Sequence, residues 1–209
     1  MSVEETYNCW ASQYDGDDNR TRDLEGAALR ETLEEISFER CLEIGCGTGK
    51  NTVWLAERAK QVTAVDLSGG MIAKAKEKIG PSDRVAFKQA DVTGEWTFCD
   101  GHYDLITFSL VLEHIKDLEP VFKNAADVLR PGGHVYIGEL HPFKQYTGSK
   151  ARFETGAGQR TAECYNHHIS DFTRSAKQHR LALADVKEYF DDNSRTGLPR
   201  ILTILLKKS

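Results

Sequence analysis

The chain lacks a long apolar segment, a signal-peptide pattern and paired cysteines. No apolar run approaches the ~18 residues that a membrane-spanning helix needs, and the acidic start at Met1–Glu5 does not have the pattern of a signal peptide. Five cysteines are scattered without a C-x-x-C pair. That distribution argues against a disulfide framework or a zinc site and favours reduced thiols. These absences predict a cytoplasmic protein that makes no use of a membrane.

The chain also lacks an excess of basic residues. It carries 27 Lys and Arg against 32 Asp and Glu, a formal net charge of −5. A broad nucleic-acid-binding face needs a basic excess, so no nucleic acid is expected as a partner. With 209 residues, 40% of them hydrophobic, the chain can bury one substantial core. We expect a single domain over 1–209, with an N-terminal helical lid, 1–36, and an insertion or flap, 141–168.

Two phosphate-binding patterns are missing from the most informative stretch, Cys41–Thr52. An apolar run there ends in a carboxylate and turns through alternate glycines, which let backbone N–H groups approach a ligand closely. A P-loop needs four residues between its first glycine and Gly-Lys-Ser/Thr, but three separate Gly45 from Gly49, and Asn51 stands where a hydroxyl is needed. A dinucleotide fingerprint needs its third glycine five positions after the first, and that position is Lys50.

The pattern that remains, E-x-G-x-G-x-G, starts at Glu43. It resembles the donor loop of class I methyltransferases that use S-adenosylmethionine, and especially the type 11 small-molecule methyltransferases. This donor has a cationic sulfonium and an α-ammonium but no phosphate, so a carboxylate suits its charge. The resemblance implies that the donor is bound by Glu43, Gly45, Gly47, Thr48 and Gly49. Glycines that serve only to turn the chain are the alternative.

Strand and helix patterns alternate along the middle of the chain, which predicts parallel strands with right-handed crossovers. Strands are expected at 40–45, 62–66, 84–89, 103–108 and 134–140, and helices at 4–14, 21–36, 49–59, 69–79 and 117–130. The sequence Leu129–Gly133, L-R-P-G-G, is a further family signature. A helix at 171–180 capped by Ser170 and an antiparallel hairpin of strands 186–190 and 201–206 complete the prediction. The fold class is α/β, a doubly wound, Rossmann-like sheet of seven strands.

Residues at the carboxyl ends of these strands predict the rest of the donor site, because ligands bind at that edge of an open α/β sheet. Asp66 lies 21 positions after Gly45, where such folds place a carboxylate that binds a ribose diol. Capping of the next helix is the alternative for Asp66, but Ser68 can cap that helix by itself. The resemblance implies donor contacts from Tyr14, Leu67, Met71, Asp91, Val92 and Ser109, with Met71 and Asp91 at the adenine.

Candidates for the acceptor site lie after the fourth strand and in the insertion. His114 and His168 are the catalytic candidates, since a neutral imidazole can accept a proton near neutral pH and a base is needed only for an acceptor that loses one. The side chains expected to hold the acceptor are those of Tyr7, His114, His141, Tyr146, Arg152, Tyr165 and His168. Arg152 favours an anionic acceptor. Hydrogen bonding within the insertion alone is the alternative.

No metal is expected, because the adjacent His167 and His168 would point to opposite faces of a strand. The predicted function is methyl transfer from S-adenosylmethionine to an O, N or C atom of a small molecule by in-line displacement, mainly through proximity and orientation. Protein or RNA methyl transfer and a non-catalytic donor-binding module are the alternatives. The sequence Phe108–Val111, FSLV, differs from the Asn/Asp-Pro-Pro-aromatic run of enzymes that methylate nucleobase amines. We expect a monomer or homodimer, and the N-terminal helix can serve either as a lid or for packing alone.

Overall fold

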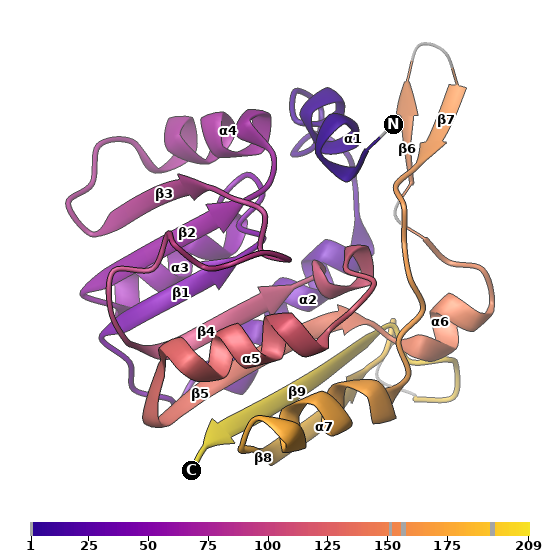
Figure 1. Ribbon diagram of the computed structural model, residues 1–209. Coiled ribbons are helices and arrows are strands. Elements are labelled where there is room, and N and C mark those ends of the chain that lie inside the picture. Colours follow the sequence, from indigo (N-terminus) through magenta and orange to yellow (C-terminus); the bar gives the residue numbers. More distant parts are fainter. Residues whose placement is uncertain (1, 151, 156–157, 193–194) are drawn as a thin grey trace.

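The computed structural model describes residues 2–150, 152–155, 158–192 and 195–209, without the side chains of 152–155 and 158–160 (Figure 1). Its centre is a seven-stranded sheet with the order β3-β2-β1-β4-β5-β9-β8. The strands are β1 (Arg40–Ile44), β2 (Gln61–Asp66), β3 (Val85–Gln89), β4 (Tyr103–Ser109), β5 (Leu129–Leu140), β8 (Leu181–Tyr189) and β9 (Ile201–Lys208). The first five pair in parallel, and β9 runs antiparallel to β5 and β8. The predicted doubly wound sheet with an antiparallel C-terminal hairpin is confirmed.

Helices cover both faces of this sheet (Figure 1). They are α1 (Val3–Trp10), α2 (Arg20–Leu33), α3 (Lys50–Arg58), α4 (Gly69–Ile79), α5 (Glu119–Val128), α6 (Pro142–Tyr146) and α7 (Ile169–Gln178), with a 3-10 turn η1 (Leu112–His114). None of the helices in the described part of the chain is long and apolar enough to cross a membrane. A short hairpin, β6 (Arg152–Thr155) and β7 (Gly158–Thr161), stands apart from the main sheet and is the two-stranded flap expected in the insertion.

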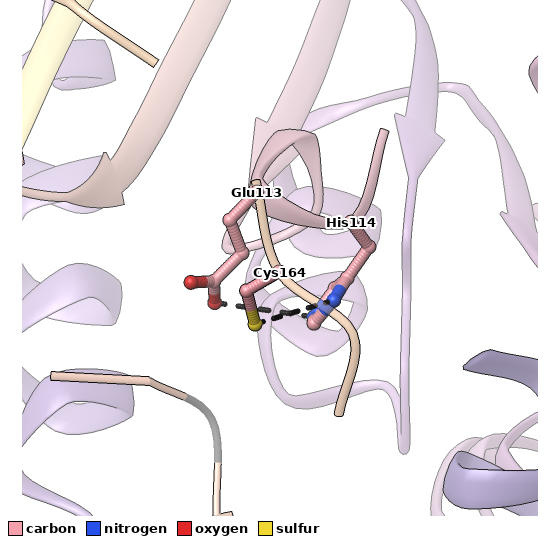
Figure 2. A group of neighbouring side chains, drawn as sticks. All are labelled: Glu113, His114 and Cys164. Atoms are coloured by element: carbon pink, nitrogen blue, oxygen red, sulfur yellow. Dashed lines mark hydrogen bonds and ion pairs between the residues drawn. The ribbon is translucent and has the colours of Figure 1, made fainter. Parts of the chain in front are cut away.

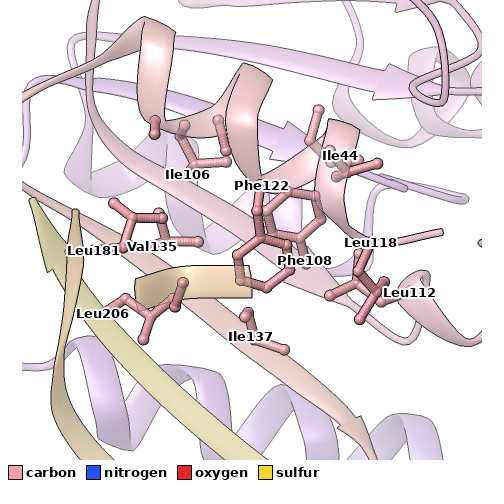
Figure 3. Close-up of a cluster of buried hydrophobic side chains, with 14 of the residues drawn as sticks. Ile44, Ile106, Phe108, Leu112, Leu118, Phe122, Val135, Ile137, Leu181 and Leu206 are labelled. Carbon is pink, nitrogen blue, oxygen red and sulfur yellow. The ribbon is translucent and has the colours of Figure 1, made fainter. Parts of the chain in front are cut away.

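Alternate strand residues build two separate hydrophobic layers, because successive side chains of a strand point to opposite faces. On one face Leu42, Ile106 and Phe108 pack with Phe122 of α5 and with α7 (Figure 3). On the other face Cys41 and Leu105 pack with side chains of α2 and α3. The two layers hold the sheet rigid, so the strand ends form a fixed edge on which a site can be built.

Some predicted boundaries are wrong. The helix expected at 117–130 ends at Val128. The strand expected at 134–140 already begins at Leu129, because the chain makes a bulge: Tyr103 pairs with Leu129, and Leu105 pairs with His134. Gly132 supplies the positive φ of 77° that this bulge needs.

The predicted start of α7 is also wrong. This helix begins at Ile169 with His168 as its N-cap, and the backbone N–H of His168 donates to the Asp171 carboxylate at 2.8 Å. Ser170 therefore lies inside the first turn instead of capping the helix. The division of the chain into one domain with a lid and a flap stays a prediction.

Candidate active site

The turn after β1 depends on its glycines for two different reasons. Gly45, Gly47 and Gly49 all have positive φ angles, of 74°, 53° and 81°. A Cβ on Gly45 would lie 2.8 Å from the Val111 side chain, and one on Gly49 would lie 3.1 Å from Ala75 of α4. A Cβ on Gly47 would meet nothing within 4 Å. Gly45 and Gly49 thus permit close packing, whereas Gly47 leaves open space in front of the turn.

That open space belongs to a cavity of about 260 Å³ along the carboxyl ends of β1, β2 and β4. Its wall contains nine of the residues predicted to bind the donor: Tyr14, Gly45, Gly47, Asp66, Leu67, Met71, Asp91, Val92 and Ser109. Tyr7 and His114, both predicted at the acceptor, also line it. We call this space the donor cavity. The individual contacts of these residues with a ligand stay predictions.

Asp66 is partly buried on the wall of the donor cavity and is held by backbone N–H groups. Its Oδ2 accepts from the N–H of Gly47 and its Oδ1 from the N–H of Ser68, each at 2.8 Å, and burial raises the pKa of its carboxyl. The Ser68 hydroxyl accepts from the N–H of Met71 at 3.1 Å, so Ser68 caps α4, as expected. Each carboxylate oxygen of Asp66 keeps a free lone pair for a hydroxyl donor.

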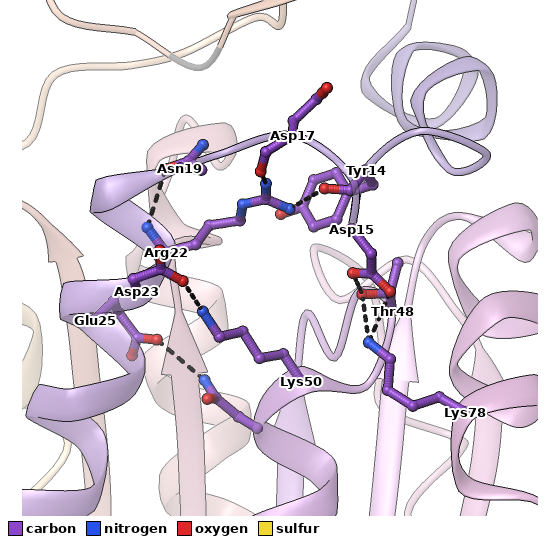
Figure 4. Close-up of polar contacts among 11 residues, drawn as sticks. Tyr14, Asp15, Asp17, Asn19, Arg22, Asp23, Glu25, Thr48, Lys50 and Lys78 are labelled. Atoms are coloured by element: carbon purple, nitrogen blue, oxygen red, sulfur yellow. Dashed lines mark hydrogen bonds and ion pairs between the residues drawn. The ribbon is translucent and has the colours of Figure 1, made fainter.

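Three of the predicted donor residues do not line the cavity. Glu43 is only 2% exposed, and its Oε2 accepts from the Thr52 hydroxyl at 2.6 Å. Burial raises the pKa of Glu43 to about 8, so this carboxyl is held toward its neutral form behind the turn. The Thr48 hydroxyl donates to Asp15 at 2.6 Å, and Lys78 pairs with the same carboxylate at 2.8 Å (Figure 4). Gly49 starts α3.

Sequence reasoning missed Arg22, which stands beside the donor cavity in α2. Its guanidinium lies 4.1 Å from the centroid of the Tyr14 ring and donates to the carbonyls of Tyr14 and Asp17 (Figure 4). Its Nε is buried without a hydrogen-bond partner among the described residues. Only the aromatic residues of this segment were singled out in the sequence, and no local pattern distinguishes Arg22 from its neighbours.

A second cavity of about 490 Å³ adjoins the donor cavity and shares Tyr7, Tyr14 and Leu110 with it. We call it the outer cavity. Polar residues dominate its wall: Asn19, Thr21, Arg22, Glu113, Thr147, Gly148, Ser149, Lys150 and Arg200, with Trp10 and Leu140. Two adjoining cavities with a common wall are suited to two ligands that react with one another.

Comparison with known proteins supports the resemblance. Residues 42–137, a little less than half of the chain, match the family model described as a methyltransferase domain, Methyltransf_11. This stretch is similar to class I S-adenosylmethionine-dependent methyltransferases. The donor cavity fits their cofactor, S-adenosylmethionine, on two observations: open space at Gly47 and a partly buried carboxylate at Asp66 with lone pairs for a diol.

Both curated proteins and solved structures similar to the chain are methyltransferases or their complexes with S-adenosylmethionine or S-adenosylhomocysteine. A demethylmenaquinone methyltransferase from Clavibacter sepedonicus is 31% identical over 113 residues, 54% of this chain and 46% of that protein. Structures similar to the chain include a DhpI-SAM-HEP complex, with a TM-score of 0.77, 23% identity and coverage of 98% and 95% of the two chains. The N-methyltransferase NodS from Bradyrhizobium japonicum WM9, in complex with S-adenosyl-L-homocysteine, has a TM-score of 0.75, 18% identity and coverage of 100% and 99%. The matches span less than half the length of the first curated relatives.

His114 is fixed in one tautomer by its neighbours. Its Nδ1 lies 2.7 Å from the Glu163 carbonyl oxygen, which can only accept, so Nδ1 carries the proton. Its Nε2 therefore accepts from the Tyr7 hydroxyl at 2.8 Å. The lone pair of Nε2 points to the place where the two cavities meet, and Tyr7 of α1 covers it.

Glu113 and Cys164 complete the surroundings of His114 (Figure 2). The Cys164 Sγ lies 3.8 Å from His114 Nδ1, and a Glu113 carboxylate oxygen lies 3.9 Å from His114 Nε2. Burial raises the pKa of the Glu113 carboxyl. The possible metal-ligand atoms of the three residues lie within 4.8 Å of one another. Both nitrogens of His114 are already hydrogen-bonded, to Tyr7 and to Glu163, so the cluster is held together by protein groups.

Four predicted acceptor residues lie off both cavity walls. His141 is fully buried, and its ring nitrogens contact the Phe143 N–H at 3.1 Å and Glu188 at 3.0 Å. Tyr146 and His168 are exposed and hydrogen-bonded to each other. The Tyr165 hydroxyl donates to its neighbour Glu163 at 2.8 Å.

These placements do not support contact with the acceptor. The hydrogen bond between Tyr146 and His168 is of the kind expected if the side chains served the insertion alone. The Arg152 side chain lies outside the described residues, so its predicted role remains a hypothesis. Of the residues proposed for the acceptor, the structure brings Tyr7 and His114 to the point where the cavities meet.

Proposed function

We propose that the protein transfers a methyl group from S-adenosylmethionine to an oxygen or nitrogen atom of a small molecule that binds in the outer cavity. The observation that carries this proposal is the shared wall of the two cavities, with His114 Nε2 beside it. When bound, the donor supplies an electrophilic methyl group on a sulfonium. Transfer then depends on holding the acceptor in line and at close range, and good alignment contributes on the order of 7 kcal/mol or more to the rate.

Each residue proposed to contact the methyl donor has a side chain or backbone group suited to one part of that molecule. Asp66 accepts hydrogen bonds from the ribose diol, since its carboxylate lines the cavity and is oriented by two backbone N–H groups. Asp91 and the backbone of Val92 contact the adenine edge, and Met71 packs on its face. Gly47 allows the backbone to approach the donor. Glu43 acts through Thr52 and the turn instead of touching the donor, because it does not line the cavity.

Arg22 binds the α-carboxylate of the donor in this proposal. Its Nε is a buried donor without a partner among the described residues, and leaving such a group unsatisfied costs free energy. Its guanidinium lies against Tyr14, a residue of both cavities. A donor carboxylate that reaches past Tyr14 would supply the hydrogen-bond acceptor that the Arg22 Nε lacks among the described residues. An Arg is well suited to this because its planar fork matches a carboxylate.

His114 acts as the general base for an acceptor that loses a proton. The Glu163 carbonyl holds the proton on Nδ1, so Nε2 is free to accept one once the Tyr7 hydroxyl has been displaced. Tyr7 thus occupies the position that an acceptor O–H or N–H would take. His168 is not required by this arrangement, because it lies on the exposed side of the insertion. The acceptor carries an anionic group, for which the outer cavity has cationic residues.

A metabolite screen tests the proposal. Release of S-adenosylhomocysteine is measured for the full chain against a library of small acceptors, with wild type and His114→Gln in parallel. We expect turnover of at least one small molecule, and a loss of kcat of about 10²-fold or more in His114→Gln at unchanged donor affinity. Turnover of proteins or RNA but of no small molecule would contradict the proposal. The oligomeric state and the cytoplasmic location stay predictions.

A further inference from the structure

Part of the outer cavity has no role in the proposed donor site. It is lined by Asn19, Thr21, Thr147, Ser149, Lys150 and Arg200, which we call the cationic end. Three segments far apart in the sequence meet there: the start of α2, the loop after α6 and the residue before β9. Each of the six side chains carries a hydrogen-bond donor. Such a lining suits a ligand group with several acceptor oxygens.

Positive charge exceeds negative charge around this end. Lys150 is exposed to the cavity and has no ion pair among the described residues. Arg200 donates to both oxygens of Asp191, and Lys144 lies 3.5 Å from the same carboxylate. Two cations, Arg200 and Lys144, therefore share one carboxylate, and Lys150 adds a further positive charge. A bound anion would lower the electrostatic energy of this arrangement, because Lys150 and Arg200 line the same cavity.

Among the described residues that line the outer cavity, Glu113 is the one with a carboxyl group. Glu113 is 6% exposed, and burial raises the pKa of its carboxyl. It stands next to His114, at the junction with the donor cavity. The carboxyl of this wall thus stands where methyl transfer is proposed, whereas Lys150 and Arg200 stand at the cationic end.

The carboxylate of the donor does not account for the cationic end. Arg22, proposed to bind that carboxylate, contacts Tyr14, which belongs to both cavities. Lys150 comes instead from the loop after α6, and none of the described residues of that loop lines the donor cavity. Two anions can therefore be bound at separate places, one from the donor and one from a second molecule.

We propose that the cationic end binds an oxyanion group of the methyl acceptor, a carboxylate or a phosphate, through Lys150 Nζ with the Ser149 hydroxyl and Arg200. Binding there places the opposite end of the acceptor at His114. The identification of the bound molecule as the methyl acceptor rests on the proposed function. In this proposal Lys150 binds the anion, whereas the sequence favoured Arg152, two residues later, for that role.

A binding experiment tests the subsite without any knowledge of the acceptor. The full chain, saturated with S-adenosylhomocysteine, is titrated with inorganic phosphate and, separately, with acetate at low ionic strength by calorimetry. We expect Lys150→Gln to weaken the better-bound anion about tenfold, since one charge-assisted hydrogen bond is lost, and Lys150→Arg to retain it. The relative affinities of phosphate and acetate tell which oxyanion the subsite prefers. Equal binding by wild type and Lys150→Gln for both anions, or no binding to either, would overturn the inference.

A matched control and a kinetic readout separate this inference from the proposed function. Lys123→Gln removes the same charge from an exposed ion pair on α5, with Asp127, and should bind both anions as wild type does. Acceptors found by the metabolite screen are compared with their neutral amides or esters. We expect Lys150→Gln to raise KM for the acid about tenfold and to leave kcat and donor affinity unchanged. If neutral and acidic acceptors are used equally by both proteins, the subsite is wrong and methyl transfer stands. If S-adenosylhomocysteine does not bind, methyl transfer itself is wrong.

Discussion

At the scale of single residues, Asp66 holds the turn together and has a proposed role in binding the donor. The carboxylate accepts from the backbone of Gly47 and Ser68 and faces the donor cavity. We expect Asp66→Ala to weaken S-adenosylhomocysteine binding by about 1–3 kcal/mol, because the hydrogen bonds to the diol are charge-assisted. The midpoint of thermal unfolding should also fall, since two backbone N–H groups lose their acceptor. Calorimetry and a thermal melt measure the two effects, and unchanged ligand affinity would refute the ribose assignment.

Because Glu43 is buried, the free energy of unfolding should depend on pH. Its pKa is raised from 4.5 to about 8 because desolvation disfavours the charged form. The folded state then keeps a proton that the unfolded state loses. This contribution to stability is fully present below pH 4.5 and is lost as the pH rises toward 8, by up to about 1.4 kcal/mol per pH unit.

We therefore expect Glu43→Gln to flatten the decline of the free energy of unfolding between pH 5 and 8. Denaturant melts of both proteins across that range measure the difference. Glu25→Gln serves as a comparison, because Glu25 is a second buried carboxyl with a raised pKa that lies off the cavity walls. Identical pH slopes for wild type and Glu43→Gln would show that Glu43 is ionised in the folded protein.

At the scale of elements, α1 packs on α4 and also lines the ligand space, and its role as a lid stays a prediction. Asn8 accepts from the Ser68 hydroxyl and the Gly70 N–H, which attaches α1 to α4. Tyr7 lines both cavities. The two roles that the sequence left open are thus compatible, since one side of the helix packs on α4 while another faces the ligand space.

We expect S-adenosylhomocysteine to slow hydrogen exchange in residues 3–17, since the ligand adds contacts to Tyr14 and orders the segment above it. In Asn8→Ala the free protein should exchange faster in the same segment, because α1 loses its attachment to α4. Residues 119–128 of α5 provide the internal reference, and their exchange should not change. Equal exchange of 3–17 with and without ligand would mean that α1 serves packing alone.

The sequence predicted the donor cavity far better than the outer cavity, for a physical reason. Donor residues sit at strand ends, and parallel pairing brings consecutive strand ends to one edge. The outer cavity joins Arg22, Lys150 and Arg200, whose meeting depends on how the segments outside the alternating core fold back. Local patterns do not encode that. The burial of His141 was not expected either, because its position after β5 gave no sign that it would contact Glu188 of β8.

At the scale of the whole molecule, the two cavities have different proposed roles, one for the methyl donor and one for the acceptor. The rigid sheet and its glycine turn form the donor cavity, whereas lid, insertion and C-terminal hairpin supply most of the outer one. Specificity is commonly carried by such loops on a rigid scaffold. Replacing 145–164 by a short Gly-Ser linker should keep donor affinity within about threefold and abolish turnover, because Lys150 and the contact of Glu163 with His114 are lost. A linker variant that methylates the acceptor at the wild-type rate would contradict this division.

Calorimetric titration of S-adenosylhomocysteine into the full chain tests whether the cavity lined by Gly47 and Asp66 binds S-adenosylmethionine. We expect one site per chain with a dissociation constant in the low-micromolar range. Gly47→Val is the matched control, because its side chain would occupy the open space above the turn and lower the affinity. A chain that is folded by circular dichroism yet releases no heat of binding, or a Gly47→Val variant that binds like wild type, would contradict the account.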